Sequence, residues 1–456
     1  MVASFLLLLG AASLSQAKQV TTQLTDHLPG QLLIKLKSST TPLTAQSSAM
    51  TSIIKKLGAN AILSVRPLLT DKAVQVIRLS KTADEDLSAA ITALKSNPQV
   101  QYAEPNFVLH ALDDGVPNDP EFYKMWAMHN TGQTDIGGSI GVSGADINIL
   151  PLWKEGFTGS RKVLVAVLDT GMDWNHPDLQ ANLYTNPGEI AGNGVDDDHN
   201  GFVDDVHGWN FYDNNNIPMD DHNHGTHCAG IIGAAGNNSV GIAGINWNVS
   251  LMPLKFLSSQ GSGSTDKAID AINYATMMKV NVMSNSWGGN GWSQGMYDAI
   301  KHARDGGVLF VAAAGNEAHN NDDEATYPAG FELDNVVSVA ATDNRDKLGI
   351  FSNYGQTTVH VAAPGVRIWS TVRGGDYASM SGTSMATPFA AGVAALVMSA
   401  HPELSYSEVK DRLIRTSTPV ASLRTKVVAK GRINAFNAMH DVVPPAIQVD
   451  KTQVIE

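Results

Sequence analysis

Three side chains of the kinds that together hydrolyse acyl bonds stand in separate short motifs of this 456-residue chain. Asp169 ends an apolar run and precedes Thr-Gly, His224 opens the segment His-Gly-Thr-His-Cys, and Ser384 lies in Gly-Thr-Ser-Met-Ala. A serine hydroxyl is a poor nucleophile at neutral pH, so a histidine must remove its proton and a carboxylate must hold the imidazole in the correct tautomer. The three motifs together indicate nucleophilic hydrolysis through Ser384.

Each motif also has a structural explanation when it is taken alone. Asp169 could be a buried cap, and a serine that precedes a helix is often an N-cap. His222, His224 and His227 could converge on zinc, but the segment lacks the glutamate of an H-E-x-x-H site. Cys228 is the single cysteine, so no intrachain disulfide can form, and we interpret it as a buried, unreactive thiol.

The elements that must position these side chains alternate between strands and helices from about residue 119. The strand-like apolar runs cover 163–168, 251–257, 280–283, 308–314 and 336–341, and the helical patterns cover 267–278, 294–304 and 389–398. Continuous apolar runs are typical of strands that are buried on both faces. The alternation predicts an α/β fold with a mostly parallel sheet flanked by helices, and a site beyond the carboxyl ends of the strands.

A smaller α/β unit is expected before this region, from residue 18 to about 112. Strand-like runs cover 31–37, 73–79 and 100–109, helical patterns cover 45–57 and 84–95, and 113–118 is typical of an exposed linker. Residues 1–17 hold a short apolar run followed by Ser-Gln-Ala, which predicts a secretory signal peptide. That run is too short to span a bilayer, so we expect no stable membrane insertion once the signal is removed.

Charge is distributed unevenly along the chain. The net charge of −13 disfavours a nucleic-acid partner, and residues 170–223 contain no Lys or Arg at all. In this acidic segment the D-x-D-x-N-G pattern before Phe202 is typical of a calcium loop, although the closing glutamate of an EF-hand is absent. The expected ligands are Asp196, Asp198, Asn200, Phe202, Asp204 and Asp205. The alternative is a solvated acidic loop.

The Asp, His and Ser motifs, in this order, resemble those of the subtilisin-like serine proteases (peptidase S8) over roughly residues 119–439. The resemblance implies a three-layer α/β domain, with Asp169 orienting His224, His224 acting as general base and then acid, and Ser384 as nucleophile. Asn316, in Ala-Ala-Ala-Gly-Asn, matches the oxyanion-hole asparagine of the family. Loss of such a donor lowers the rate by about 10²–10³.

The resemblance also implies substrate-binding and metal-binding residues. For the walls of the substrate cleft it implies Ser286, Trp287, Gly288, Ala314 and Gly315. For a second calcium site it implies Asp119, Asp178, Gly236, Asn238, Val240 and Ile242. Oxygen ligands on irregular loops suit Ca²⁺, and an ion that binds only the native state stabilises it.

The leading unit resembles the family's pro-region, a ferredoxin-like inhibitor of the I9 type that assists folding, and an accessory domain is the alternative. The expected organisation is a signal peptide (1–17), a propeptide (18–114), a peptidase domain (115–440) and a C-terminal extension or linker (441–456). We therefore expect a secreted, monomeric, calcium-stabilised serine endopeptidase that matures by self-processing. It would cleave proteins or peptides and be inhibited by its own propeptide.

Two other functions stay open. A catalytically silent member would serve as a scaffold or binding protein, although all four catalytic positions are intact. A serine esterase of the α/β-hydrolase type should show G-x-S-x-G and a serine that precedes its acid and histidine, and here the order is reversed.

Overall fold

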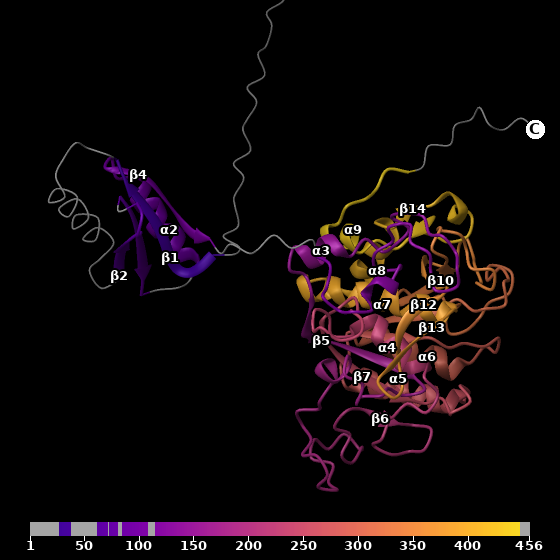
Figure 1. The fold of residues 1–456 in the computed structure, drawn as a ribbon. Coiled ribbons are helices and arrows are strands. Elements are labelled where there is room, and N and C mark those ends of the chain that lie inside the picture. The colour runs from indigo at the N-terminus through magenta and orange to yellow at the C-terminus, as the bar shows by residue number, and fades with distance from the viewer. Residues whose placement is uncertain (1–26, 38–61, 72, 81–83, 108–114, 447–456) are drawn as a thin grey trace, which may run out of the picture. The chain divides into compact units, whose positions relative to one another are not determined.

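The computed structural model describes residues 27–37, 62–71, 73–80, 84–107 and 115–446 (Figure 1). The predicted signal peptide, the expected helix at 45–57 and residues 447–456 of the expected C-terminal extension lie outside these ranges. The chain divides into two compact units, Met1–Leu112 and Asp113–Glu456, and their boundary falls at the start of the predicted linker.

The described part of the first unit is an antiparallel sheet, in the strand order β2-β3-β1-β4, with one helix packed on it. Its elements are β1 (His27–Leu36), β2 (Ile62–Pro67), β3 (Val74–Leu79), α2 (Asp84–Lys95) and β4 (Val100–Phe107). Leu87 and Leu94 of α2 pack with Leu32 and Ile34 of β1 in its core. The helix expected at 84–95 is confirmed with the same bounds, and the strands expected at 31–37, 73–79 and 100–109 are confirmed within four residues over the described part of the chain. Strand β2 was not predicted.

A nine-stranded sheet in the order β14-β15-β11-β10-β9-β8-β5-β7-β6 forms the centre of the second unit. Its strands are β5 (Gly159–Asp169), β6 (Trp209–Asn210), β7 (Asn248–Lys255), β8 (Val282–Asn285), β9 (Leu309–Ala313), β10 (Val336–Thr342), β11 (Val361–Pro364), β14 (Thr418–Pro419) and β15 (Gly431–Arg432). Every pairing in it is parallel except that of β14 with β15. The mostly parallel sheet is therefore confirmed. Strands β12 (Ile368–Val372) and β13 (Asp376–Met380) form a separate hairpin.

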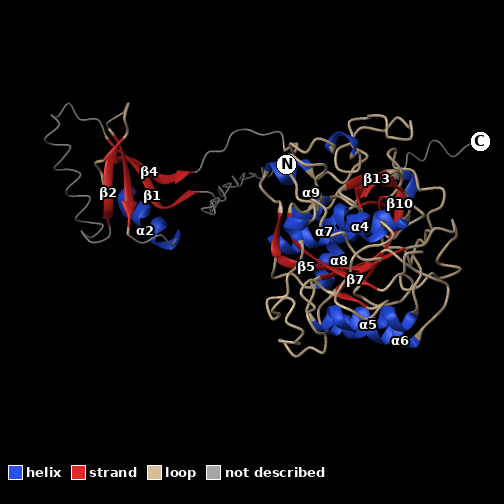
Figure 2. Cartoon of the chain, turned by 60° about the horizontal axis from the view of Figure 1, so that its bottom comes forward, coloured by secondary structure: helices blue, strands red, loops and turns tan. Residues whose placement is uncertain are grey.

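Helices cover both faces of this sheet. Figure 2 shows α4 and α7 on one face and α5 and α6 on the other. The helices are α3 (Leu150–Lys154), α4 (His224–Gly233), α5 (Thr265–Met277), α6 (Gln294–Asp305), α7 (Thr383–Ala400), α8 (Tyr406–Arg415) and α9 (Ala435–His440), with short 3-10 turns η2 (Phe122–Lys124), η3 (Gln180–Asn182) and η4 (Ala421–Leu423). Alternate residues of β5 serve the two layers: Val165 and Val167 pack with α4 and α7, while Ala166 and Leu168 pack with α5 and α6. This alternation explains why β5 is apolar at consecutive positions.

Helix α7 is long and apolar enough to cross a membrane by length and composition. However, 83% of its apolar window is buried inside the second unit. Such burial is typical of the central helix of a globular core.

The strand order places a switch point at β5. Strand β7 lies on one side of β5, and β8, β9, β10 and β11 follow one another on the other side. In sheets of this kind, sites form outside the carboxyl ends of the strands at the switch point. Asp169 is the last residue of β5 and therefore lies at that position.

Candidate active site

Asp169 and His224 form a hydrogen-bonded pair at the carboxyl end of β5. Asp169 Oδ1 accepts a hydrogen bond of 2.7 Å from His224 Nδ1, and its side chain is 1% exposed whereas that of His224 is 21% exposed. Thr170 N also donates to Asp169 Oδ1, at 2.7 Å. With Nδ1 as the donor, Nε2 is the ring atom that can accept a proton. The pair therefore has the geometry of a general base with its orienting carboxylate.

The pKa of His224 is raised above its ordinary value of 6.5. Burial lowers this pKa, but the charge of Asp169, its hydrogen bond to the ring and the charge of Asp220 together outweigh the effect of burial. A protonated imidazole cannot act as a base, so this direction sets the lower pH limit of catalysis.

We expect kcat/KM to rise with pH through a midpoint above 6.5, because His224 must lose its proton before it can act. Asp169→Asn removes the carboxylate charge while burial remains, so the same midpoint should move to lower pH, with kcat lower by about 10⁴. The measurement is the hydrolysis of a short peptide amide from about pH 5 to 9. A midpoint that stays in place in the Asn variant would contradict this assignment.

The approach of α4 to β5 brings the pair together, and glycine is required for it. A Cβ atom on Gly225 would lie 2.1 Å from Gly171 O, so no larger residue fits directly after His224. Gly225 N donates to Thr170 Oγ1 at 2.9 Å, which connects the first turn of α4 to the end of β5. This contact explains the glycine of the His-Gly-Thr-His motif.

Asp220 caps the start of α4 and was missed in the sequence. Its Oδ2 accepts hydrogen bonds from Thr226 N at 3.0 Å and Thr226 Oγ1 at 2.6 Å, and its Oδ1 accepts from Thr170 Oγ1 at 2.8 Å. Asn223, which stands at the N-cap position, makes no capping hydrogen bond with its side chain. An acidic residue shortly before a helix start was the available signal.

Ser384 lies inside the first turn of α7, which begins at Thr383, and not just before the helix as expected. Its Oγ donates to Ser286 O at 3.1 Å, and Ser286 Oγ donates to Ser384 O at 2.8 Å. Within the part of the chain that the structure describes, no hydrogen bond joins Ser384 Oγ to His224. The hydroxyl must therefore turn toward the imidazole before it attacks, and such hydrogen bonds often form only when substrate binds.

Ser384, His224 and Asn316 line one cavity of about 630 Å³. Asn316 Oδ1 accepts hydrogen bonds from Thr383 N at 2.9 Å and Thr383 Oγ1 at 3.0 Å. The side-chain oxygen of Asn316 therefore already has two hydrogen-bond donors. Its Nδ2 atom lies 3.8 Å from the position that a Cβ atom on Gly382 would take. The oxyanion-donor role expected for Asn316 uses this Nδ2 atom, because only an N–H group can donate to the oxygen that becomes negative.

The residues expected at the cleft walls fall into two groups. Ser286, Trp287 and Gly288 line the cavity, whereas Ala314 and Gly315 are not among its lining residues. Ala314 is fully buried, and its carbonyl accepts hydrogen bonds from the amides of two asparagine side chains. The Trp287 ring packs edge-on against Phe256, with 4.9 Å between the ring centroids, and both residues line the cavity.

The two other candidate reactive groups near the site are packed groups. His227 Nε2 hydrogen-bonds the carbonyls of Ile368 and Ala378 at 3.1 and 3.2 Å, and burial lowers its pKa to about 3. His227 is therefore neutral and donates to the backbone, which disfavours the zinc alternative. Burial raises the pKa of the Cys228 thiol, which donates to Ser384 O at 3.5 Å. This agrees with an unreactive cysteine.

The acidic loop brings three carboxylates together, and only two of them were predicted. Ligand-type oxygens of Glu189, Asp198 and Asp205 lie within 4.8 Å of one another. The Asn200 amide donates to Asp198 and Asp205. The other expected ligands make different contacts: Asp196 accepts from Asn200 N and Gly201 N, Asp204 accepts from Gly192 N and Gly194 N, and the Phe202 ring packs on Trp209 and Tyr274. Glu189 precedes the D-x-D-x-N-G pattern, so the pattern could not indicate it.

A second group of carboxylates faces the loop 236–242. Asp119 accepts from Asn238 N at 3.1 Å, and Asp178 accepts from Asn238 Nδ2 at 2.9 Å and Ile242 N at 2.9 Å. Burial raises the pKa of both Asp119 and Asp178. No Lys or Arg of the described residues forms an ion pair with either one, so this buried charge fits a cation. Gly236 and Val240 lie in the same loop.

Comparisons with known proteins agree with this geometry. The model of the subtilase family, peptidase S8, matches residues 160–436, and that of the fervidolysin N-terminal prodomain matches residues 13–106. A thermophilic serine proteinase of Bacillus sp. (strain AK1) is 33% identical over 414 residues, which cover 91% of this chain and 88% of that protein. Thermitase of Thermoactinomyces vulgaris is 38% identical over 275 residues, which cover 60% of this chain and 88% of thermitase.

A third relative is longer than this chain. Subtilisin-like protease 1 of Plasmodium berghei is 35% identical over 297 residues. The match covers 61% of this chain but only 50% of that protein. The family match covers more than half of the chain and contains Asp169, His224, Asn316 and Ser384. The chain therefore belongs to the subtilase family of serine-type endopeptidases and carries an N-terminal prodomain.

Proposed function

We propose that this chain is a secreted, calcium-stabilised endopeptidase that cleaves proteins or peptides through an acyl-enzyme on Ser384 and matures by cutting its own propeptide. The observation that carries the proposal is the Asp169–His224 hydrogen bond of 2.7 Å beside a cavity that His224 shares with Ser384 and Asn316. We propose the domain limits given above, with propeptide 18–114 and peptidase domain 115–440, and a monomeric state.

In the proposed reaction the same side chains act in both halves, which are the formation of the acyl-enzyme and its hydrolysis. His224 Nε2 takes the proton of Ser384 Oγ as the oxygen attacks the peptide carbon, and Asp169 stabilises the imidazolium. Asn316 Nδ2 donates to the oxygen that becomes negative in the tetrahedral intermediate. The imidazolium then protonates the leaving amine, and the same steps with water release the acyl group.

Titration with a fluorophosphonate tests this proposal. We expect one adduct per folded mature chain, located on Ser384 by peptide mass mapping, together with hydrolysis of a peptide amide. Absence of an adduct would support the scaffold alternative. Hydrolysis of esters without any hydrolysis of peptides would support the esterase.

The prodomain match supports the role proposed for the propeptide. An α/β core with many long-range contacts folds slowly, and a docked template can lower that barrier. We propose that the first unit acts on its own protease domain in this way and inhibits it until the connection is cut. The short apolar run in residues 1–17 supports secretion.

Calcium would have a structural role in this proposal. At the loop 236–242, Asp119, Asp178 and Asn238 would hold the ion, with backbone carbonyls of Gly236, Val240 and Ile242. In the acidic loop, Asp198 and Asp205 would hold it, with Glu189 added to the predicted set. Bound Ca²⁺ would compensate the negative charge of these carboxylates. Because it would bind the native state and not the unfolded state, it would stabilise the fold.

We expect chelation with EDTA to lower Tm by about 5–10 °C, the shift that corresponds to loss of an ion held at about 100 Kd. The initial rate at low temperature should change little, because neither group of carboxylates lines the catalytic cavity. Asp178→Asn and Asp198→Asn should each remove part of the EDTA effect. Asp298→Asn, an exposed position on α6, is the matched control. A Tm that is insensitive to EDTA in the unmodified protein would remove the calcium proposal.

A further inference from the structure

A charged side chain is buried beside the catalytic aspartate without any role in the reaction above. Lys255 is 1% exposed, and it is the last residue of β7. In the parallel pairing of β5 with β7, its register partner is Asp169. Burying an ammonium group costs free energy unless hydrogen bonds and an opposite charge compensate for it, so the contacts of Lys255 need an explanation.

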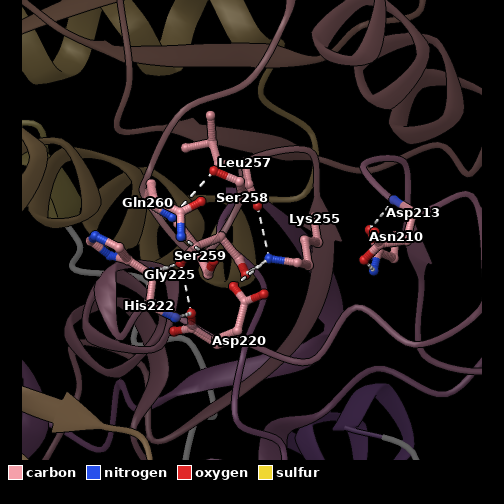
Figure 3. A network of polar contacts seen from close by, with 12 residues as sticks. Asn210, Asp213, Asp220, His222, Gly225, Lys255, Leu257, Ser258, Ser259 and Gln260 are labelled. Atoms are coloured by element: carbon pink, nitrogen blue, oxygen red, sulfur yellow. Dashed lines mark hydrogen bonds and ion pairs between the residues drawn. The ribbon is translucent and has the colours of Figure 1, made fainter.

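All three hydrogens of the Lys255 ammonium have acceptors, and each acceptor lies on a different segment. Nζ donates to Thr170 O at 2.8 Å, to Leu257 O at 2.8 Å and to Asp221 Oδ1 at 2.7 Å. Figure 3 shows the Lys255 side chain extending toward the side of the network that contains Leu257 and Asp220, and away from the separate Asn210–Asp213 contact. The three segments are the end of β5, the exit of β7 and the loop that precedes α4.

Each of these segments carries part of the catalytic site. Thr170 N donates to Asp169 Oδ1, the same atom that receives the hydrogen bond from His224. Asp221 follows Asp220, whose carboxylate caps the first turn of α4 and so holds the backbone of His224. Leu257 and the residues 260–263 line the catalytic cavity.

We propose that Lys255 is a positioning residue: its ammonium holds the Asp169–Thr170 backbone, the loop before His224 and the cleft wall that starts at Leu257 in one fixed arrangement. This inference rests on the proposed catalytic roles. Of the three contacts, the ion pair is the weakest determinant, because the Asp221 side chain is 45% exposed and exposed ion pairs contribute little. The two carbonyl contacts are buried, and removing their donor leaves both carbonyls unpaired.

The pH profile reports on this arrangement, because the acid limb depends on how well Asp169 faces His224. The titratable groups around His224 are Asp169 on β5, Asp220 in the preceding loop, and His222, His227 and Cys228 on the His224 segment. Of these groups, Asp169 alone hydrogen-bonds the ring. If Asp169 is displaced, it raises the pKa of His224 less than it does in the unmodified enzyme, so the acid limb moves to lower pH. A loss of stability alone would not move it.

The test compares Lys255→Met with Lys410→Met in the full precursor after maturation. Lys410 is a partly buried lysine on α8, outside the cavity. Activity is expressed per Ser384 titrated with fluorophosphonate, so that misfolded chains do not count. We expect Lys255→Met to lower kcat/KM on a peptide amide by about tenfold to a hundredfold, the usual cost of a small misplacement, and to shift the acid limb to lower pH. Lys410→Met should change Tm only.

Two further variants separate the contacts. Asp221→Asn removes the ion pair but keeps an acceptor at the same place, so its acid limb should match that of the unmodified enzyme. Lys255→Gln keeps a neutral donor for the carbonyls and replaces Lys255→Met in the test if that variant does not mature. Its acid limb should move in the same direction, but by less. A normal acid limb and normal kcat/KM in every Lys255 variant that folds would overturn the proposal. An unmodified chain that forms no adduct at Ser384 would instead refute the catalytic roles.

Discussion

Ser384→Ala should lower kcat for peptide hydrolysis by about 10⁶, the loss that removal of the nucleophile from such a triad produces. The variant retains the buried helix α7, and among the described residues the hydroxyl makes one hydrogen bond, to Ser286 O. The fold should therefore persist while the attacking atom is gone. The residual rate would come from the oxyanion donor and from substrate binding.

The same substitution should stop maturation. If cleavage between the propeptide and the protease domain uses Ser384, the Ala variant should accumulate as the full precursor, seen as a single larger band with an amino terminus before residue 114. Ser399→Ala is the matched control, because Ser399 lies near the other end of α7, where its hydroxyl donates to Leu396 O at 2.7 Å. Clean processing of the Ser384→Ala precursor in the absence of other proteases would show that this chain does not mature itself.

His224→Ala should also lower kcat by about 10⁶, because it removes the imidazole that Asp169 orients and that takes the serine proton in the proposed reaction. Its neighbour His227 is fully buried, donates to two backbone carbonyls and has its pKa lowered to about 3, so it cannot replace the missing base. The acid limb of kcat/KM should disappear with the imidazole. Any residual hydrolysis should depend on hydroxide alone.

The measurement is the pH dependence of peptide amide hydrolysis per folded chain. His302→Ala on the exposed side of α6 is the control, and it should retain the activity and the limb of the unmodified enzyme. Folding is checked by Tm, since a partial fall in Tm is expected where the ring no longer fills its place beside Asp169. A His224→Ala enzyme that retains the acid limb would place the essential base elsewhere.

Much of the catalytic centre could be predicted from the sequence because its chemistry is local. Asp169, His224, Asn316 and Ser384 each stand in a short motif, and the strands that carry Asp169 and precede Asn316 are buried, continuous apolar runs. The mostly parallel sheet was predicted for the same reason. Strand β11 (Val361–Pro364) was missed, and it ends in a proline, a residue that argues against a central strand.

The supporting contacts could not be predicted because they join segments far apart in the chain. Asp220 caps α4 and also binds Thr170, 50 positions earlier, and no pattern within either segment requires this. Lys255 had one visible signal, a charge inside an apolar run, but its acceptors are set by the pairing of β5 with β7. Glu189 joins Asp198 and Asp205 only through the path of the loop.

Helix α7 bears the attacking residue on its first turn, while almost all of its remaining length forms the middle of the molecule. An unfolded or partly folded chain therefore has Ser384 but no active site. The serine hydroxyl comes close to His224 and Asn316 only after the core has packed around this helix. Under the proposed mechanism a chain that has not yet folded cannot cleave its neighbours, and proteolytic activity should fall in proportion to the folded fraction when a sample is heated. Surviving proteolysis would thus count the intact molecules in a mixture.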